Sequence, residues 1–150
     1  MRKFDITSIS TMAHGVVATL SGTTPAKGNM MSVDDFGTAT FLYATGVVTD
    51  AGAAGGFTVE IQESLTTADA GFSAVADADL TRLESALSVT VDTQDGVPIG
   101  MIGYLGSEKY VRAVITGTTG TDATVVGIWL GQHGRYAPPT SDIAANVAAT

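Results

Sequence analysis

Alternating apolar and polar residues predict several β-strands along the chain. In 57–62 every second residue is apolar and the residues between are polar, which gives a strand one buried and one exposed face. The longest strand signal is 38–48, where Thr and aromatic residues suit a sheet. The other predicted strands cover 16–20, 72–76, 88–92, 99–105, 110–116 and 124–130.

Glycine-rich and polar segments between these strands predict the connections. The Gly-rich segment 50–56 suggests a long-loop hairpin between 38–48 and 57–64, and Gly106-Ser107 suggests a second hairpin between 99–105 and 110–116. The segment 26–35 is predicted as a loop. At 80–87 a short helix capped by Asp79 competes with extended chain, because leucines recur there at helical spacing.

About eight short strands, separated by turn signals and without long amphipathic helices, predict an all-β fold. We expect an antiparallel two-layer β-sandwich, jelly-roll or immunoglobulin-like, with extended N- and C-terminal arms. The expected boundaries are an arm at 1–14, one sandwich domain at 15–131 and a second arm at 132–150. The predicted core consists of Phe41, Tyr43, Val59, Ile61, Val75, Val89, Val91, Ile102, Tyr104, Val111, Ile115, Val125 and Trp129.

Composition narrows the classes of partner. The chain has 15 Asp and Glu residues against 7 Lys and Arg residues, a net charge of -8, so it would repel a nucleic-acid backbone. No apolar run approaches the ~20 residues that span a bilayer, and the N-terminus lacks the apolar core of a secretion signal. Charged residues make up only 15%, where about a quarter is usual, which favours extensive contact with other protein.

The residues that could carry catalysis are sparse, and we predict that the protein is not an enzyme. Cysteine is absent. The two histidines, His14 and His133, lack carboxylates at metal-ligand spacing, so neither a metal nor a cofactor is expected. Glu60 and Glu63 fall on opposite faces of their strand and cannot flank one bond as a glycosidase pair does. One of them is expected to pair with Arg112 across the sheet.

Three stretches carry a resemblance to a known family. They are Phe-Thr-Val-Glu-Ile-Gln-Glu-Ser at 57–64, Phe-Ser-Ala-Val-Ala-Asp-Ala-Asp-Leu at 72–80, and 102–106 together with 109–114. Together they resemble the head cement or decoration proteins of tailed bacteriophages and gene transfer agents. Family members often have an Asp-Gly turn after the Glu-Ser pair, whereas this chain has a different loop at 65–71.

The resemblance implies a β-sandwich that binds the outer surface of the assembled head and stabilises contacts between major capsid protein subunits. Its implied partners are the major capsid protein and neighbouring copies of itself. Its implied location is the outer capsid surface of the virion, after assembly in the host cytoplasm. The alternatives are another virion structural protein, such as a tail or head-spike component, and a carbohydrate-binding adhesion module.

The two terminal arms supply the candidate contact residues. Extended arms reach over neighbouring subunits at up to ~3.3 Å per residue. The expected capsid or subunit contacts are Phe4, Ile6 and Ile9 in the N-terminal arm and Arg135 and Tyr136 in the C-terminal arm. The alternative is that these side chains pack back on their own domain.

Overall fold

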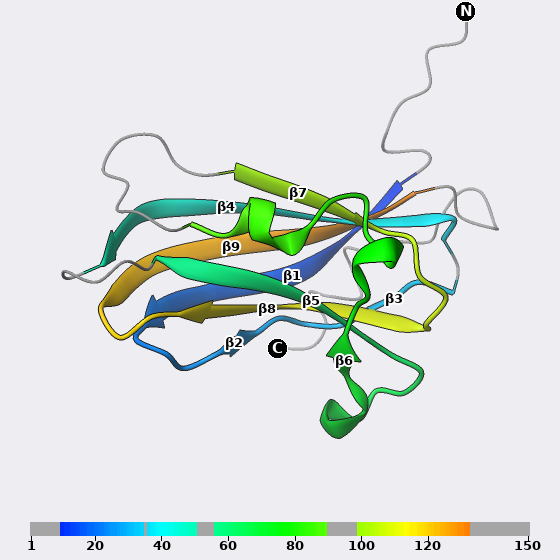
Figure 1. The fold of residues 1–150 in the computed structure, drawn as a ribbon. Coiled ribbons are helices and arrows are strands. Elements are labelled where there is room, and N and C mark those ends of the chain that lie inside the picture. Colours follow the sequence, from blue (N-terminus) through cyan, green and yellow to red (C-terminus); the bar gives the residue numbers. More distant parts are fainter. Residues whose placement is uncertain (1–9, 35, 51–55, 90–98, 133–150) are drawn as a thin grey trace, which may run out of the picture.

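The computed structural model describes residues 10–34, 36–50, 56–89 and 99–132, which form two layers of antiparallel strands (Figure 1). The first sheet has the order β1-β9-β4-β7, with bounds β1 Ser10–Ser21, β9 Thr121–Gln132, β4 Thr38–Asp50 and β7 Ile99–Tyr104. The second sheet has the order β2-β8-β5-β6, with bounds β2 Ala26–Lys27, β8 Tyr110–Gly117, β5 Phe57–Ser64 and β6 Ser73–Ala74. The short strand β3, Met31–Ser32, also pairs with β8.

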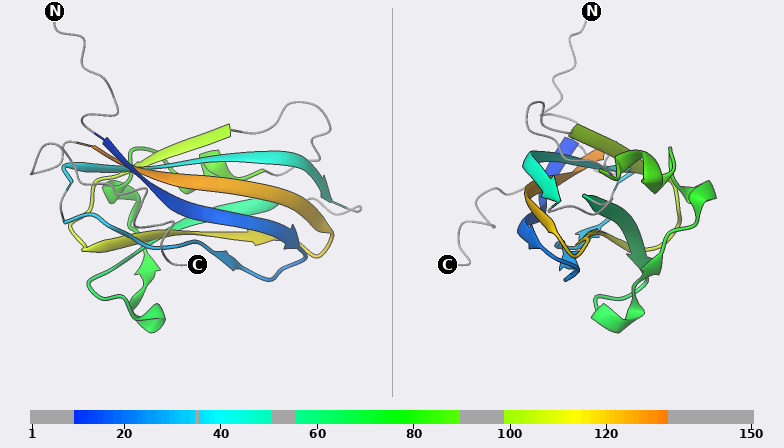
Figure 2. Two further views of the ribbon diagram at one scale, coloured as in Figure 1. Left: turned by 180° about the vertical axis from the view of Figure 1, so that it is seen from behind. Right: turned by 60° about the vertical axis from the view of Figure 1, so that its left-hand side comes forward.

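The strand order identifies a jelly roll. The connections from β2 to β3 and from β5 to β6 stay in the second sheet, and every other connection passes from one sheet to the other (Figure 2). This alternation between two packed antiparallel sheets is the jelly-roll arrangement. The predicted antiparallel sandwich is therefore confirmed, and the topology selects the jelly roll over the immunoglobulin-like alternative.

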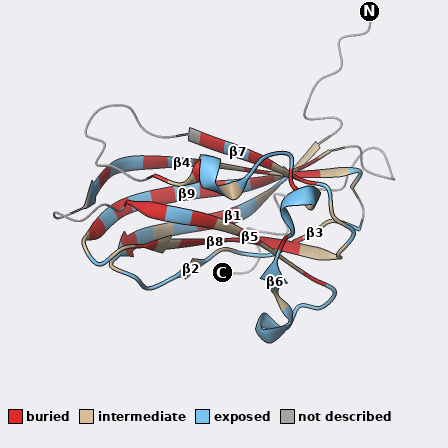
Figure 3. Cartoon of the chain, in the orientation of Figure 1, coloured by how far each residue is buried: buried red, intermediate tan, exposed pale blue. Residues whose placement is uncertain are grey.

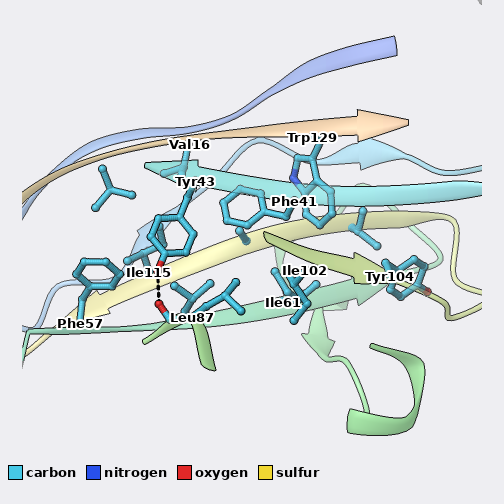
Figure 4. Packing of buried hydrophobic residues seen from close by; sticks show 14 of the residues in the cluster. Val16, Phe41, Tyr43, Phe57, Ile61, Leu87, Ile102, Tyr104, Ile115 and Trp129 are labelled. Atoms are coloured by element: carbon cyan, nitrogen blue, oxygen red, sulfur yellow. Dashed lines mark hydrogen bonds between the residues drawn. The ribbon is translucent and has the colours of Figure 1, made fainter. Parts of the chain in front are cut away.

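Both predicted hairpins are wrong. Strands β4 and β5 lie in different sheets, and so do β7 and β8. Consecutive strands are separated because they supply opposite sides of one core. Phe41 of β4 and Ile61 of β5 are both fully buried and face each other from opposite layers (Figure 4). Each strand instead pairs with a strand distant in sequence, as β4 does with β9 and β7.

The helix considered at 80–87 does not form. The described chain has only short 3-10 turns in this region, η3 at Asp77–Asp79 and η4 at Glu84–Leu87, after the earlier turn η2 at Asp69–Gly71. Leu80 and Leu87 are buried but Leu83 is 54% exposed, so the three leucines do not share the single face that a packed helix requires. Leu80 instead forms an isolated bridge with Tyr104 at the edge of β7.

The sandwich is more extensive than predicted. The segment 26–35, expected as a loop, contributes β2 and β3 to the edge of β8. Ser10 pairs with Gln132 at the start of the ladder between β1 and β9, whose register shifts once, between His14 and Val16. Residues 10–14 and Gln132 therefore belong to the first sheet and not to terminal arms, because their backbone groups complete the ladder on the central strand β9.

The space between the sheets holds an aromatic core (Figure 4). The predicted core residues are all buried except Val91, which lies outside the described residues. The rings of Phe41 and Trp129 are 5.1 Å apart at their centroids. The hydroxyl of Tyr43 donates a hydrogen bond to the carbonyl of Leu87, and burial raises the pKa of this tyrosine. Inward and outward residues alternate along β9, whereas the register shifts between His14 and Val16 in β1 and between Thr45 and Val48 in β4.

Candidate functional site

The five residues predicted to make capsid contacts lie outside the described residues. They are Phe4, Ile6, Ile9, Arg135 and Tyr136. The same holds for His133. The contact role of the terminal segments therefore stays a prediction.

The remaining candidates for chemistry have structural partners. His14 lies on β1, where its Nδ1 is 2.6 Å from Nδ2 of Asn29. Glu60 accepts a hydrogen bond of 2.6 Å from the Gln62 side chain, and Glu63 accepts one of 2.5 Å from the hydroxyl of Tyr104. In the part of the chain that the structure describes, no group of three or more His, Cys, Asp and Glu side chains could hold a metal.

One hollow lies beside Glu63 and another beside Tyr104, the two partners of one hydrogen bond. One, of about 290 Å³, is lined partly by Glu63 and Glu108, and the other, of about 140 Å³, is lined partly by Phe36 and Leu105. Burial and the hydrogen bond to Glu63 raise the pKa of Tyr104, so its hydroxyl remains a donor at neutral pH. The hydroxyl also accepts the backbone N–H of Glu108 at 2.8 Å. These contacts hold the loop before β8 in place.

The outer face of the second sheet is polar and cross-linked around Arg112. This side chain is only 9% exposed, and its Nε donates to Oε1 of Gln62 at 2.8 Å. Its Nη1 donates to Asp69, and its guanidinium lies 4.1 Å from the ring centroid of Phe72. Lys27 of β2 reaches the other oxygen of Asp69 at 2.7 Å. The network attaches the loop between β5 and β6 to the face of the sheet.

The expected pairing of Arg112 with Glu60 or Glu63 is wrong. The register places Gln62 directly opposite Arg112, and the carboxylate comes from Asp69 in the loop. Hydrogen bonds from Lys27 and then from Arg112 lower the pKa of Asp69 below its ordinary value.

The outer face of the first sheet is apolar. The register aligns His14 with Ile128, Leu42 and Met101 across all four strands in one row. The rows on either side bring Met12 beside Leu130, and Val17 beside Val126 and Ala44. We define the apolar face as Met12, Val17, Leu42, Ala44, Met101, Val126, Ile128 and Leu130.

Several of these side chains are open to solvent. Val17 is 60% exposed, Met101 49% and Val126 46%. Figure 3 colours the exposed positions along these strands pale blue. No Asp, Glu, Lys or Arg lies among the described outward residues from the Thr19–Thr124 pair to the Met12–Leu130 pair; the polar members there are His14, Thr40 and the two threonines. The first acidic side chain, Asp122, lies beyond that boundary. The face is thus an uncharged apolar surface on an acidic protein.

One signal in the sequence could have revealed the apolar face. A solvated antiparallel strand usually alternates between apolar and polar residues, whereas a strand covered on both sides is a continuous apolar run. The segment 125–130, Val-Val-Gly-Ile-Trp-Leu, is such a run in β9. Its inward residues are buried in the core, and its outward residues Val126, Ile128 and Leu130 belong to the apolar face.

Comparisons with known proteins find structural likenesses only. No family model matches the sequence, and no curated protein matches it. A solved structure from work on Bacillus endospore appendages, described as a novel family of disulfide-linked pili, is 12% identical with a TM-score of 0.35, over 89% of this chain and 97% of that chain. A structure from work on CBM4 structure and function is 13% identical with a TM-score of 0.35, over 80% of this chain and 66% of that chain.

The class of protein is defined by strand order and register: an antiparallel jelly-roll β-sandwich. Among the described elements, no helix has both the length and the apolar character needed to cross a membrane.

Proposed function

We propose that the protein is a non-catalytic capsid decoration protein that binds the outside of an assembled bacteriophage or gene-transfer-agent head. The observation that carries the proposal is the uncharged apolar face on the first sheet, since contiguous exposed apolar patches mark interaction sites and copies gathered on one shell can bury such a face against one another. The sequence resemblance at 57–64, 72–80, 102–106 and 109–114 supplies the choice of the capsid as partner.

The proposed mechanism is the burial of interface at many equivalent positions on one shell. Each copy contributes a modest contact to neighbouring major capsid protein subunits, and contacts within an array reinforce one another. In this proposal the terminal segments reach the shell, with Phe4, Ile6 and Ile9 on one side and Arg135 and Tyr136 on the other. The net charge of -8 keeps decorated particles apart by repulsion.

The proposal is tested by adding the purified protein to undecorated heads from its own source. We expect it to co-sediment with the heads and to appear as ordered density outside the capsid lattice in electron cryo-microscopy. Density confined to the tail or to a single vertex would move the protein to another virion part. Binding to host cells or glycans without binding to heads would favour an adhesion module.

A truncation separates contacts made by the N-terminal segment from those of the sandwich. A chain lacking residues 1–9 keeps all of β1, which begins at Ser10, so we expect unchanged thermal unfolding and weaker occupancy on heads. Full occupancy after truncation would assign the capsid contact to another part of the molecule.

A further inference from the structure

We infer that the apolar face of the first sheet is covered by a second copy of this chain. The inference deepens the proposed function, on which it rests for the assembly of copies on a shell, and self-association in solution tests it separately. The terminal segments are then left to contact the capsid, and the apolar face joins one copy to the next.

The charge distribution favours this face as the place where two copies meet. Two chains that each carry a net charge of -8 repel each other over most orientations. An interface centred on Ile128, Leu42 and Met101 lessens this repulsion, because no Asp, Glu, Lys or Arg of the described face lies in that row, whose fourth member is His14, or in the rows beside it. The apolar face therefore lets two acidic copies approach without opposing carboxylates.

The character of β9 supports burial on both sides. Its inward residues, such as Trp129, are already buried in the core of one copy. A second sheet packed face to face on Val126, Ile128 and Leu130 would give these outward residues the same kind of apolar neighbours. Packed sheets lie about 10 Å apart with their strands within about 30° of each other, so the apolar faces of two copies are suited to ordinary sandwich packing.

The size of the face sets the strength of the contact. Four strands spaced about 4.8 Å apart, over about seven residues at about 3.4 Å each, make a plane of roughly 450 Å² per copy. Stable interfaces bury about 800 Å² per partner, and smaller ones are weak and reversible. We therefore expect association that depends on protein concentration and that strengthens when copies are gathered on a shell.

The test compares two variants with the same change in net charge. Ile128→Lys places a lysine at the centre of the apolar face, and Thr58→Lys places one on the exposed outer side of β5, beside Glu60. Both bring the net charge from -8 to -7, which lowers overall repulsion. Lost association in Ile128→Lys alone would therefore come from the charge on the face.

Sedimentation velocity over a hundredfold range of concentration measures the result. We expect the unmodified chain and Thr58→Lys to shift together from monomer to dimer or a larger oligomer, and Ile128→Lys to associate at least tenfold more weakly. A chain that stays monomeric over the whole range would overturn the inference. So would an oligomer that survives Ile128→Lys unchanged.

A second variant keeps the test usable if Ile128→Lys does not fold. Met101→Lys lies on the edge strand β7 and is 49% exposed, so it disturbs the core less than a change in the central strand. If Ile128→Lys unfolds, as shown by circular dichroism, Met101→Lys decides the question by the same criterion.

Head binding distinguishes failure of the inference from failure of the proposed function. If the chain decorates heads but stays monomeric at every concentration, the proposed function is supported and this inference is contradicted. If the chain associates through the apolar face but does not bind heads, the inference is supported and the proposed function is contradicted.

Discussion

The two outer faces of this jelly roll differ although the sheets beneath them share one core. On the second sheet Arg112, Gln62 and Asp69 form a connected polar network, and the loop between β5 and β6 is attached to it. On the first sheet apolar side chains such as Val17 and Met101 stand exposed. The polar network on the second sheet is complete within one chain. The first sheet, in contrast, leaves apolar area that a partner can bury. The comparison shows that the polar groups on the second sheet bind one another, whereas the apolar side chains on the first sheet stay exposed even where they lie side by side.

The largest expected loss of stability comes from removing Arg112, the centre of the polar network on the second sheet. Arg112→Ala removes a nearly buried guanidinium and leaves Gln62, Asp69 and Phe72 without it, so we expect the free energy of unfolding to fall by about 2–3 kcal/mol. Urea unfolding followed by the fluorescence of the buried Trp129 measures this loss. Arg112→Lys, which keeps the charge but not the planar fork, should lose less. A loss below about 0.5 kcal/mol for the alanine variant would show that the network contributes little.

A smaller effect is expected when the concentration of protein is raised. If the apolar face is buried between copies, the folded state is stabilised by mass action, by about 1.4 kcal/mol at ten times the dissociation constant. For a chain of this size that corresponds to a rise of about 3 °C in Tm. Differential scanning calorimetry at several concentrations measures it. Ile128→Lys should show a flat Tm, and a flat Tm in the unmodified chain would contradict burial of the face between copies.

The polar network on the second sheet is expected to stabilise the fold less in acid, because Asp69 becomes protonated. Because hydrogen bonds from Lys27 and Arg112 lower its pKa, the stability that its ionised form contributes is present above its ordinary pKa, near 4, and is lost as pH falls through the lowered value. Urea midpoints for the unmodified chain and Asp69→Asn should differ at pH 7 and converge toward pH 2. A gap that stayed constant with pH would assign the stabilisation to something other than the carboxylate charge.

The smallest effect is expected at the exposed end of the same network. The Lys27–Asp69 pair is about half exposed on both sides, and such surface pairs contribute little. Lys27→Ala should lower the free energy of unfolding by at most about 0.5 kcal/mol in urea unfolding. A loss as large as that of Arg112→Ala would mean that the lysine, and not the arginine, holds the loop.

The sequence predicted the core because burial follows local periodicity. Val59, Ile61 and Trp129 could be assigned inward from their own segments, and each is buried. Prediction from the sequence failed for contacts between residues that are distant along the chain. The partner of Arg112 is Asp69, which belongs to a loop without strand periodicity, and no spacing rule connects the two.

The apolar face was missed for the same reason. The sequence placed Leu42 on one side of its strand, opposite Phe41, but it could not show that Leu42 aligns with Ile128 and Met101. That alignment requires the order β1-β9-β4-β7, in which each strand pairs with strands remote in sequence. Both predicted hairpins followed the opposite assumption, that consecutive strands pair.

The position of β9 between β1 and β4 also bears on synthesis. As the chain leaves the ribosome, β1 and β4 emerge long before Thr121–Gln132, the strand that must pair with both. The first sheet therefore cannot close until β9 has been made, and such long-range pairing is slow and exposed to aggregation. We expect nascent chains that stop before Thr121 to need chaperone protection, and the sheet to form in a single late step.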